Sequence, residues 1–438
     1  MKTSKITRPV LDLAHRLREN VRASTGGKSK PGQSGLRQTF ARRGTPAAPD
    51  AQGASCLVVA HNYHPAVGAA AARLRLVTEE LQARGIRVTV LTSSTSQELA
   101  GPAGERVVGT DRRWMPRSRL FGTAVLAVRA AASAANFDVV LSDPPPHVAF
   151  GAMTGARLGR KPGVFYFCDS WASVASSRGG RAWDGASQLF GALEGQASRL
   201  ASATVASTPA LVERARRTSN QVELVRNGTD LAVYTAEGPA WQGTPLPQRY
   251  FLYAGTMGLV HGADVFVEAA QRLWGQGADF GLVFVGSGAE AAPIREAAAA
   301  SQGRIVFMDP VSPSEVAALL RGSTGALSSM RPVPGYEDAW PVKTLAAMAC
   351  GAIPVYVSGG DLADELAAQE LAFVEPYGVE GAERALSAAL ALGEQQRAEM
   401  CARCRSHAAE HFDQRRAASS VAGLVARLVE DNARGHRR

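Results

Sequence analysis

The sequence has few cysteines and no long apolar run. Its five cysteines include one Cys-x-x-Cys pair, Cys401 and Cys404, and no second pair that would complete a zinc site. We expect reduced thiols, as in a cytosolic protein, with this pair packed in a helix. No run of about 18 uncharged apolar residues occurs, and the N-terminus lacks the apolar segment of a signal peptide. These absences predict a cytoplasmic protein without a membrane span.

Acidic residues are scarce only near the N-terminus. Residues 1–50 contain 11 Lys and Arg against 3 Asp and Glu, a net charge of +8. The remaining 37 basic and 36 acidic residues nearly cancel, because the whole chain has 48 and 39. A basic groove that follows a phosphate backbone needs its cations on the folded body. We therefore predict no nucleic-acid partner and a basic tail on a neutral body.

Residues 1–54 form this basic tail, which we expect to be largely disordered. Residues 23–54 are rich in Gly, Ser, Pro and Arg and have no apolar periodicity. Before them, four apolar residues recur at helical spacing beside several arginines, namely Val10, Leu13, Leu17 and Val21. A short amphipathic basic helix there would contact an anionic membrane surface; the alternative is a solvated tail.

From Ser55 on, strand and helix patterns alternate. The run Cys56–Ala60, a loop at His61–Gly68, a helix at Ala69–Arg84 and a strand at Arg87–Leu91 form a βαβ unit. Further strands with helices between them are expected at Asp138–Leu141, Gly163–Phe167, Ala203–Ala206 and Gln221–Val225. Such alternation predicts a parallel sheet covered on both faces.

A polar, Pro-containing stretch, Leu231–Gln248, interrupts this pattern, and a second series follows. Its strands are expected at Tyr250–Ala254, Gly281–Val285, Arg304–Met308, Gly325–Ser328 and Ile353–Val357, and its helices at Ala263–Trp274, Ala289–Ala300, Pro313–Arg321 and Val342–Ala349. We predict an α/β protein with two Rossmann-like, doubly wound domains, residues 55–235 and 236–412, facing a central cleft. Residues 413–438 would add a C-terminal helix, about Ala417–Asn432, and a basic end.

Three strand ends of the second series lead into helices through small residues. These loops are Ala254–Asp264 (AGTMGLVHGAD), Val285–Glu290 (VGSGAE) and the start of Gly335–Gly351 (GYEDAWPVKTLAAMACG). In the third, Pro341 begins a helical turn that contains Lys343. Free N–H groups, the positive end of a helix and a lysine favour an anion, so we predict a bound nucleotide diphosphate. Glu337 and Asp338 would either cap the helix or contact a sugar.

Two other uses of such folds are excluded by missing motifs. The first strand–helix turn lacks G-x-G-x-x-G, and the second strand ends in Thr92-Ser93-Ser94 without an acid for a ribose, so the chain does not fit a dehydrogenase. It also lacks G-x-x-x-x-G-K-[ST], which argues against a P-loop NTPase.

The motifs resemble family 4 of the retaining glycosyltransferases, and within it the branch of bacterial surface-polysaccharide enzymes that includes fucosamine transferases. The resemblance runs from about Ser55 to Leu428. Its landmarks are HNYHPAVGAAAARLRLVTEELQARGIRVTVLTS, LSDPPPH, FCDSW, VRNGTD, YAGTMGLVHGADVFVEAA, LVFVGSGAE and WPVKTLAAMACGAIPV.

This resemblance implies the GT-B fold, a nucleoside-diphosphate sugar held mainly by the C-terminal domain, an acceptor held mainly by the N-terminal domain, and no metal. It places four groups of residues. Gly255, Thr256, Gly262, Val342, Lys343 and Thr344 would lie near the diphosphate, Ser287 and Gly288 near the nucleoside, Asp338 near the sugar, and Asn62, Gly68 and Asp169 on the acceptor side. The departing diphosphate would be stabilised electrostatically, with Asp338, Lys343 and Asp169 as the catalytic candidates.

The chain departs from the family pattern at the donor loops. Thr256 and His261, both donor-binding candidates here, replace an Arg and a Lys. Asp338 and Ala346 replace a pair of glutamates, of which the second usually holds the ribose. We therefore keep three hypotheses: a retaining hexosyltransferase acting on a glycan, lipid-linked or small-molecule acceptor at the cytoplasmic membrane face, a catalytically weakened nucleotide-binding or scaffold protein, and a GT-B sugar-nucleotide epimerase.

Overall fold

The computed structural model describes residues 53–66, 68–110, 119–301, 303–333 and 339–435. Residues 1–52 of the predicted tail, its amphipathic helix and the candidate residues Glu337 and Asp338 lie outside the described residues.

The first sheet has eight strands in the order β3-β4-β2-β1-β5-β6-β7-β8. These are β1 (Ser55–Ala60), β2 (Arg87–Thr92), β3 (Glu98–Ala100), β4 (Arg106–Gly109), β5 (Val139–Ser142), β6 (Gly163–Phe167), β7 (Ala203–Ala206) and β8 (Val222–Leu224). All neighbours pair in parallel except β3 and β4, which are antiparallel.

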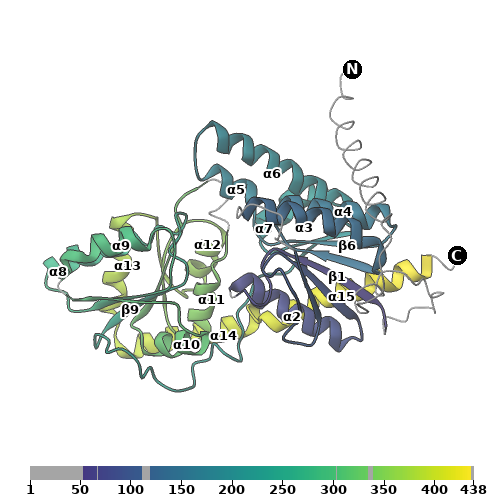
Figure 1. The fold of residues 1–438 in the computed structure, drawn as a ribbon. Helices are drawn as coiled ribbons and strands as arrows, with labels where there is room; N and C mark the ends of the chain where they lie inside the picture. Colours follow the sequence, from purple (N-terminus) through teal and green to yellow (C-terminus); the bar gives the residue numbers. More distant parts are fainter. Residues whose placement is uncertain (1–52, 67, 111–118, 302, 334–338, 436–438) are drawn as a thin grey trace, which may run out of the picture. The chain divides into compact units, whose positions relative to one another are not determined.

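Helices cover both faces of this sheet. They are α2 (Ala69–Ala83), α3 (Arg119–Ser133), the 3-10 turn η1 (Ala134–Asn136), α4 (Pro146–Leu158), α5 (Trp171–Ser176), α6 (Arg181–Leu200) and α7 (Pro209–Arg216). In Figure 1, α3, α4 and α6 lie on one side of the strands, and α2 lies on the other beside the last helix of the chain, α15 (Gln414–Gly435).

The second sheet has six parallel strands in the order β11-β10-β9-β12-β13-β14. They are β9 (Tyr250–Ala254), β10 (Gly281–Val285), β11 (Ile305–Met308), β12 (Gly325–Ser329), β13 (Pro354–Val357) and β14 (Phe373–Glu375). No helix or strand is present in the described chain between β8 and β9.

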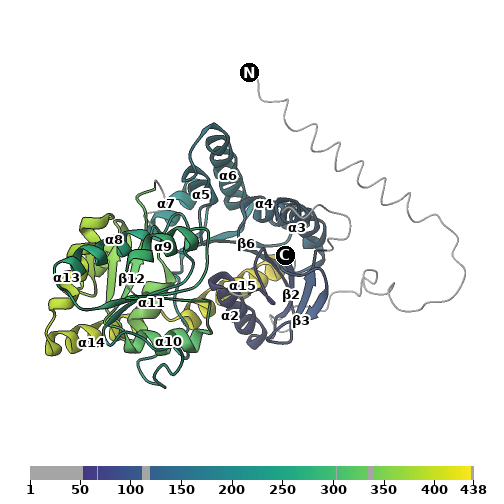
Figure 2. The same cartoon turned by 60° about the vertical axis from the view of Figure 1, so that its left-hand side comes forward.

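The helices of the second sheet also form two layers. They are α8 (Asp264–Gly275), α9 (Ala291–Ala297) with η2 (Ala298–Ala300), α10 (Pro313–Gly322), α11 (Val342–Ala349), α12 (Asp361–Ala368), α13 (Val379–Ala391) and α14 (Glu394–His411). Figure 2 shows α8, α9 and α13 on one face of these strands and α10, α11 and α14 on the other. At the start of α10, Ser312 and Glu315 form a capping box next to Pro313, which fixes where this helix begins.

Alternating side chains of each central strand enter two different cores. In β1, Cys56 and Val58 pack beneath α2 and α15, whereas Leu57 and Val59 pack beneath α3 and α4. In β9, Phe251 packs with α8 and α13, and Leu252 packs with α10 and α11. Burial on both faces explains why these strands read as continuous apolar runs.

The predicted α/β class with two doubly wound sheets is confirmed, and the differences are local. The predicted helix at Ala289–Ala300 begins two residues later and ends in the turn η2, and the last helix begins at Gln414 rather than Ala417. The antiparallel edge formed by β3 and β4 is an addition to the predicted parallel sheet. Both strands are too short to give a periodic signal.

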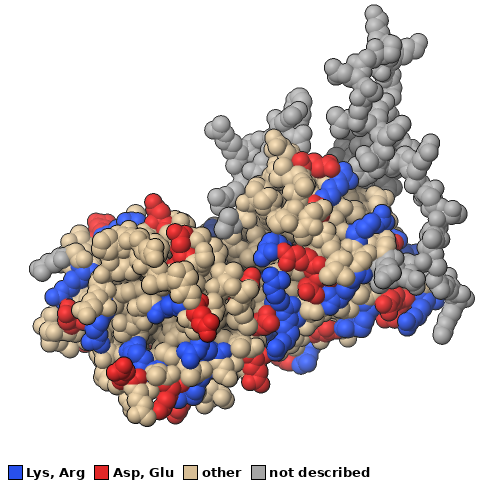
Figure 3. Space-filling model, turned by 90° about the horizontal axis from the view of Figure 1, so that it is seen from below, with Lys and Arg blue, Asp and Glu red and all other residues tan. Residues whose placement is uncertain are grey.

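Charges are mixed on the body of the molecule. On the face seen in Figure 3, Lys and Arg side chains are interspersed with Asp and Glu, in keeping with the near-zero net charge after residue 50. Among the described residues, no helix combines the length and apolar character that a membrane span requires.

Candidate functional site

The order of the second sheet reverses between β9 and β12, which are neighbours although two strands separate them in the chain. Ligands of open parallel sheets bind at the carboxyl ends of the strands beside such a reversal. Two of the three predicted loops, those after β9 and β12, leave the sheet here, and the third follows β10, which pairs with β9. The fold therefore gathers the three predicted loops at the carboxyl ends of neighbouring strands.

Lys343 lies in the first turn of α11 and extends to the loop after β9. Its Nζ donates a hydrogen bond to the Tyr253 hydroxyl at 2.6 Å and lies 3.9 Å from the centre of the Tyr253 ring. The same hydroxyl donates to the carbonyl of Thr256 at 2.9 Å. A Cβ atom on Gly255 would lie 3.7 Å from the Lys343 Nζ. The ammonium group is thus held against the backbone of the predicted phosphate loop.

Burial changes the acid–base behaviour of Lys343. Although part of the residue remains accessible to solvent, removal of its ammonium from water lowers the pKa of Lys343 to about 7. No carboxylate pairs with this lysine among the described residues. A cation that lacks a counter-charge at the start of a helix is a favourable partner for a phosphate group.

The loops after β9 and β10 are joined backbone to backbone. The N–H of Gly255 donates to Val285, that of Met257 to Ser287 and that of Glu290 to Met257, at 2.9, 2.9 and 3.0 Å. This close approach requires glycine, because a Cβ atom on Gly286 would lie 2.1 Å from the Gly255 carbonyl oxygen. Four candidate residues of the two joined loops are exposed to solvent, namely Gly255, Thr256, Ser287 and Gly288.

His261 belongs to the same loop but carries no charge at neutral pH. Its backbone carbonyl accepts a hydrogen bond from Ser329 Oγ at 2.6 Å, which ties the loop to the end of β12. Burial, reinforced by the charge of Lys343, lowers the pKa of His261 to about 3. His261 therefore does not replace the family's loop cation, and its imidazole is a neutral neighbour of Lys343.

The three candidate residues in the first turn of α11, Val342, Lys343 and Thr344, have two different roles. Val342 and Lys343 are the first two helical residues, whose N–H groups precede any intrahelical acceptor. Thr344 is buried, its N–H donates to the carbonyl of Pro341 at 3.0 Å, and its Oγ1 donates to Ser328 Oγ at 2.9 Å. The Thr344 hydroxyl thus joins α11 to β12, its N–H is taken up within the first turn of α11, and Val342 and Lys343 supply the free helix end.

Arg331, at the end of β12, is a cation that the sequence patterns did not indicate. Its Nη2 lies 3.1 Å from Asp264 and 3.6 Å from Glu290, and its Nε donates to the Tyr377 hydroxyl at 3.1 Å. A Cβ atom on Gly262 would lie 2.7 Å from this Nε. Arg331 therefore fastens together the loops after β9, β10 and β14, and its charge is already balanced by two carboxylates.

The acceptor-side candidates lie at the carboxyl ends of strands in the first sheet. Asn62 and Gly68 belong to the loop between β1 and α2, and Asp169 follows β6; all three are exposed. None of them makes a hydrogen bond or ion pair with Lys343 or the loop after β9 within the described ranges. The structure thus groups the donor-side residues with one another and leaves these three on a separate sheet.

Behind Asp169 lies a buried ion pair. Arg73 Nη2 of α2 donates to Asp143 Oδ1 at 2.9 Å, and both side chains are nearly inaccessible. The Arg73 guanidinium also lies 5.1 Å from the centre of the Tyr166 ring. Burial and the nearby Asp169 raise the pKa of Asp143, opposed by Arg73. The pair joins α2 to the loop after β5, beside the order reversal of the first sheet between β1 and β5.

Ala346, the position of the missing family acid, faces the interior. It is 4% exposed and packs in the apolar cluster that contains Leu252, Val283 and Val285. Helix α11 therefore presents no carboxylate to a ribose at this position.

The chain matches two protein-family models. Residues 70–233 match Glycosyltransferase Family 4, and residues 248–391 match Glycosyl transferases group 1. Comparison with curated protein sequences finds no match.

Solved structures share the fold over nearly the whole described chain. Sucrose-phosphate synthase (tll1590) from Thermosynechococcus elongatus has a TM-score of 0.67 and 16% identity, with 86% of this chain and 100% of that chain covered. Anabaena Alr3699/HepE in complex with UDP has a TM-score of 0.64 and 13% identity, covering 85% and 99%. WaaG, a glycosyltransferase involved in lipopolysaccharide biosynthesis, has a TM-score of 0.64 and 16% identity, covering 84% and 99%. One glycosyltransferase family model matches the first half of the chain, a second matches the second half, and the fold is that of these structures. Together these findings identify the chain as a glycosyltransferase with the GT-B fold.

Proposed function

We propose that this glycosyltransferase takes a sugar from a nucleoside-diphosphate sugar and transfers it, with retention, to a glycan, lipid-linked or small-molecule acceptor. Surface-polysaccharide synthesis at the cytoplasmic face of a bacterial membrane is the role that we assign. The observation that carries the proposal is the position of Lys343, whose ammonium lies against the loop after β9 at the start of α11.

This arrangement suits a diphosphate on three grounds. Lys343 supplies a cation that pairs with no carboxylate in the described part of the chain, the first residues of α11 supply N–H groups and the positive end of a helix, and the Gly255 loop permits close approach. The Anabaena neighbour was solved in complex with UDP, a ligand of the class that we assign to this site.

Catalysis would be electrostatic. Negative charge develops on the diphosphate as the bond to the sugar breaks, and Lys343 with the helix end would stabilise that charge without a metal ion. The departing phosphate itself would accept the proton of the acceptor hydroxyl. In this proposal Ser287 and Gly288 contact the nucleoside and Asp338 contacts the sugar, while Asn62, Gly68 and Asp169 bind on the acceptor side.

A second candidate function follows from Ala346. A buried alanine cannot hydrogen-bond the ribose hydroxyls, and the loss of such a bond costs about 1 to 3 kcal/mol. A protein that binds a nucleotide but turns it over slowly, or that serves as a scaffold, is compatible with this position. An epimerase would instead need clustered acids and bases, and no specific contact in the described structure favours it.

A thermal-shift experiment with UDP, GDP, dTDP and ADP tests the binding site that both leading candidates share. At a hundredfold excess over Kd, a bound nucleotide stabilises the fold by about 2.7 kcal/mol, so at least one of the four should raise Tm. Lys343→Ala removes a charge-assisted contact and should weaken that nucleotide about 10- to 100-fold.

The matched control is Lys161→Ala, because Lys161 is paired with Asp138 at 3.5 Å next to the first residues of β5 and β6 and lies outside the donor loops. It should leave the nucleotide affinity unchanged. If no nucleotide shifts Tm at millimolar concentration, or if both variants behave alike, the site is wrongly assigned.

A further inference from the structure

Trp340 is a buried anchor immediately before the start of α11. It is 4% exposed and makes an edge contact with Phe412, with ring centres 5.7 Å apart and an angle of 81°. The guanidinium of Arg226 lies 4.6 Å from the centre of the Trp340 ring. Only Pro341 and Val342 separate this anchor from Lys343. A shift of Trp340 would therefore be passed to the helix start that carries the lysine.

Arg226 belongs to the segment by which the chain leaves the first sheet, two residues after β8. Its Nη1 lies 3.2 and 3.1 Å from the two carboxylate oxygens of Glu365 on α12. The same carboxylate lies 3.0 Å from His407 Nε2 of α14. A planar guanidinium can stack on a ring and pair with a carboxylate at once, which an ammonium cannot do equally well.

Backbone bonds fix the segment that carries Arg226. The N–H of Thr229 donates to the carbonyl of Phe412 at 2.8 Å, and the N–H of Gln414 donates to the carbonyl of Thr229 at 3.1 Å. A Cβ atom on Gly228 would lie 2.4 Å from the Phe412 carbonyl oxygen, so the segments around Gly228 and Phe412 are in direct contact. The segment that leads from the first sheet toward the second therefore lies against the segment that leads back from α14 to α15.

We infer that Arg226 and Trp340 are positioning residues for Lys343, and that they make nucleotide affinity depend on the segment between the two sheets. Lys343 is held at its far end by the Tyr253 hydroxyl and at its backbone by the start of α11. The Arg226–Trp340–Phe412 stack fixes that start, and two of its members, Arg226 and Phe412, lie outside the nucleotide loops. This inference rests on the proposed function, because it assumes that Lys343 binds the diphosphate.

The Trp340 indole N–H allows this role to be separated from ordinary packing. Its Nε1 is buried and has no hydrogen-bond partner within the described residues, a state that costs stability. Trp340→Phe removes the unpaired N–H and keeps an aromatic ring against Phe412, but it reduces the surface under Arg226. A packing role predicts lower stability with unchanged affinity. A positioning role predicts retained stability with weaker nucleotide binding.

The test is calorimetric titration of the full chain with the nucleotide, among UDP, GDP, dTDP and ADP, that the wild-type protein binds. Arg226→Ala should raise Kd about tenfold, a size expected for loss of a partly buried cation–π contact. Arg226→Lys and Trp340→Phe should raise it about threefold at an unchanged Tm, because each keeps part of the stack.

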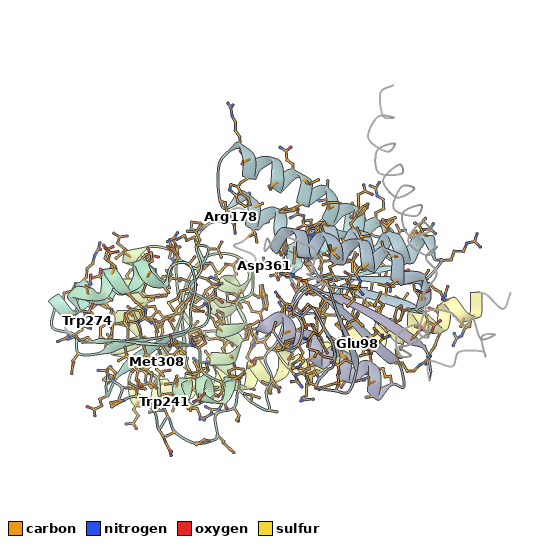
Figure 4. The ribbon with its side chains drawn as sticks, in the orientation of Figure 1. Glu98, Arg178, Trp241, Trp274, Met308 and Asp361 are labelled. Carbon is orange, nitrogen blue, oxygen red and sulfur yellow. The ribbon has the colours of Figure 1, made fainter. Side chains whose placement is uncertain are left out.

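Arg304→Ala is the matched control. The Arg304 guanidinium lies 5.6 Å from the Trp274 ring, which is the same kind of contact. Arg304 directly precedes β11 and so lies at the amino end of that strand, whereas Lys343 lies at the carboxyl end of β9. Figure 4 shows Trp274 far from Asp361, the first residue of α12. The Kd of Arg304→Ala for the nucleotide should stay within about twofold of the wild-type value.

The possible failures are distinguishable. Wild-type binding with unchanged Kd values in the Arg226 and Trp340 variants overturns the inference alone. A loss of affinity in Arg304→Ala equal to that in Arg226→Ala also overturns it, because the effect would then be general destabilisation. If the wild-type protein binds none of the four nucleotides, the proposed function fails and this inference fails with it. Should Arg226→Ala not fold, Arg226→Lys and Trp340→Phe decide.

Discussion

At the scale of single residues, Lys343 combines its proposed role in nucleotide binding with a pKa close to neutrality. Its environment lowers the pKa to about 7, so the free protein at pH 8 holds it mostly uncharged. A bound diphosphate favours the ammonium form and raises that pKa. Binding above pH 7 must therefore take up a proton.

This linkage predicts that nucleotide affinity falls as pH rises from 7 to 9. The slope should approach tenfold per pH unit at most, and the terminal phosphate, with a second pKa of about 6, is already ionised there. Calorimetry in two buffers of different ionisation enthalpy would measure the proton uptake directly. Lys343→Arg keeps its charge throughout this range, so its affinity should not change with pH. An equal slope in both proteins would contradict the role of Lys343.

Lys343 could be found from the sequence because proline, lysine and a helical pattern occur together in a short segment. Tyr253 and Arg331 could not be found in this way. The partner of Tyr253 is 90 residues away, and Arg331 contacts residues of three other loops. His261 was recognised as part of the loop, but its lowered pKa depends on burial that only the folded chain creates.

At the scale of elements, the interlocked loops after β9 and β10 hold the predicted phosphate surface. Gly286 has a φ of 136° and nearly touches the Gly255 carbonyl, whereas Gly277 has a φ of 91° with open space around it. Both positions disfavour other residues on backbone grounds. At Gly286 alone of these two, a side chain would also collide with the neighbouring backbone, at the Gly255 carbonyl.

We predict that Gly277→Ala costs about 1 kcal/mol of unfolding free energy, and that Gly286→Ala costs more and also weakens the nucleotide. Urea unfolding and nucleotide titration of the two variants would measure these effects. Equal stability and affinity in the two variants would show that contact between the loops is unimportant.

The buried pair of the first sheet makes a second prediction at this scale. Asp143→Asn leaves Arg73 buried without its counter-charge, which should cost about 3 to 5 kcal/mol in unfolding free energy. Glu98→Gln breaks the exposed pair with Arg106 and should cost less than about 1 kcal/mol; Glu98, on β3, is labelled in Figure 4. Similar losses in the two variants would contradict a special role for burial.

Strands with apolar runs and helices with clear ends could be predicted within a few residues. Tyr250–Ala254 and Val342–Ala349 are observed with the bounds that the sequence predicts. The pairing order, the edge strand β3 and the contact of the chain at Thr229 with Gln414 could not be predicted, because they depend on residues far apart in the chain.

At the scale of the whole molecule, the excess positive charge belongs to residues 1–50 and not to the body. We predict that removal of these residues leaves nucleotide affinity unchanged but reduces binding to anionic phosphatidylglycerol vesicles. Each basic residue near such a surface contributes about 1 kcal/mol. Vesicle sedimentation at low and high salt, with neutral phosphatidylcholine vesicles as the control, measures this. Equal sedimentation of the full and shortened chains would exclude the tail as a membrane contact.

The proposed sugar transfer is tested most directly by a panel of nucleotide sugars scored for released nucleoside diphosphate, with and without candidate acceptors. We predict release from one class of donor, increased by an acceptor and reduced about 10- to 100-fold in Lys343→Ala. Nucleotide binding without release from any donor would contradict sugar transfer by this protein and favour a weakened or scaffolding role.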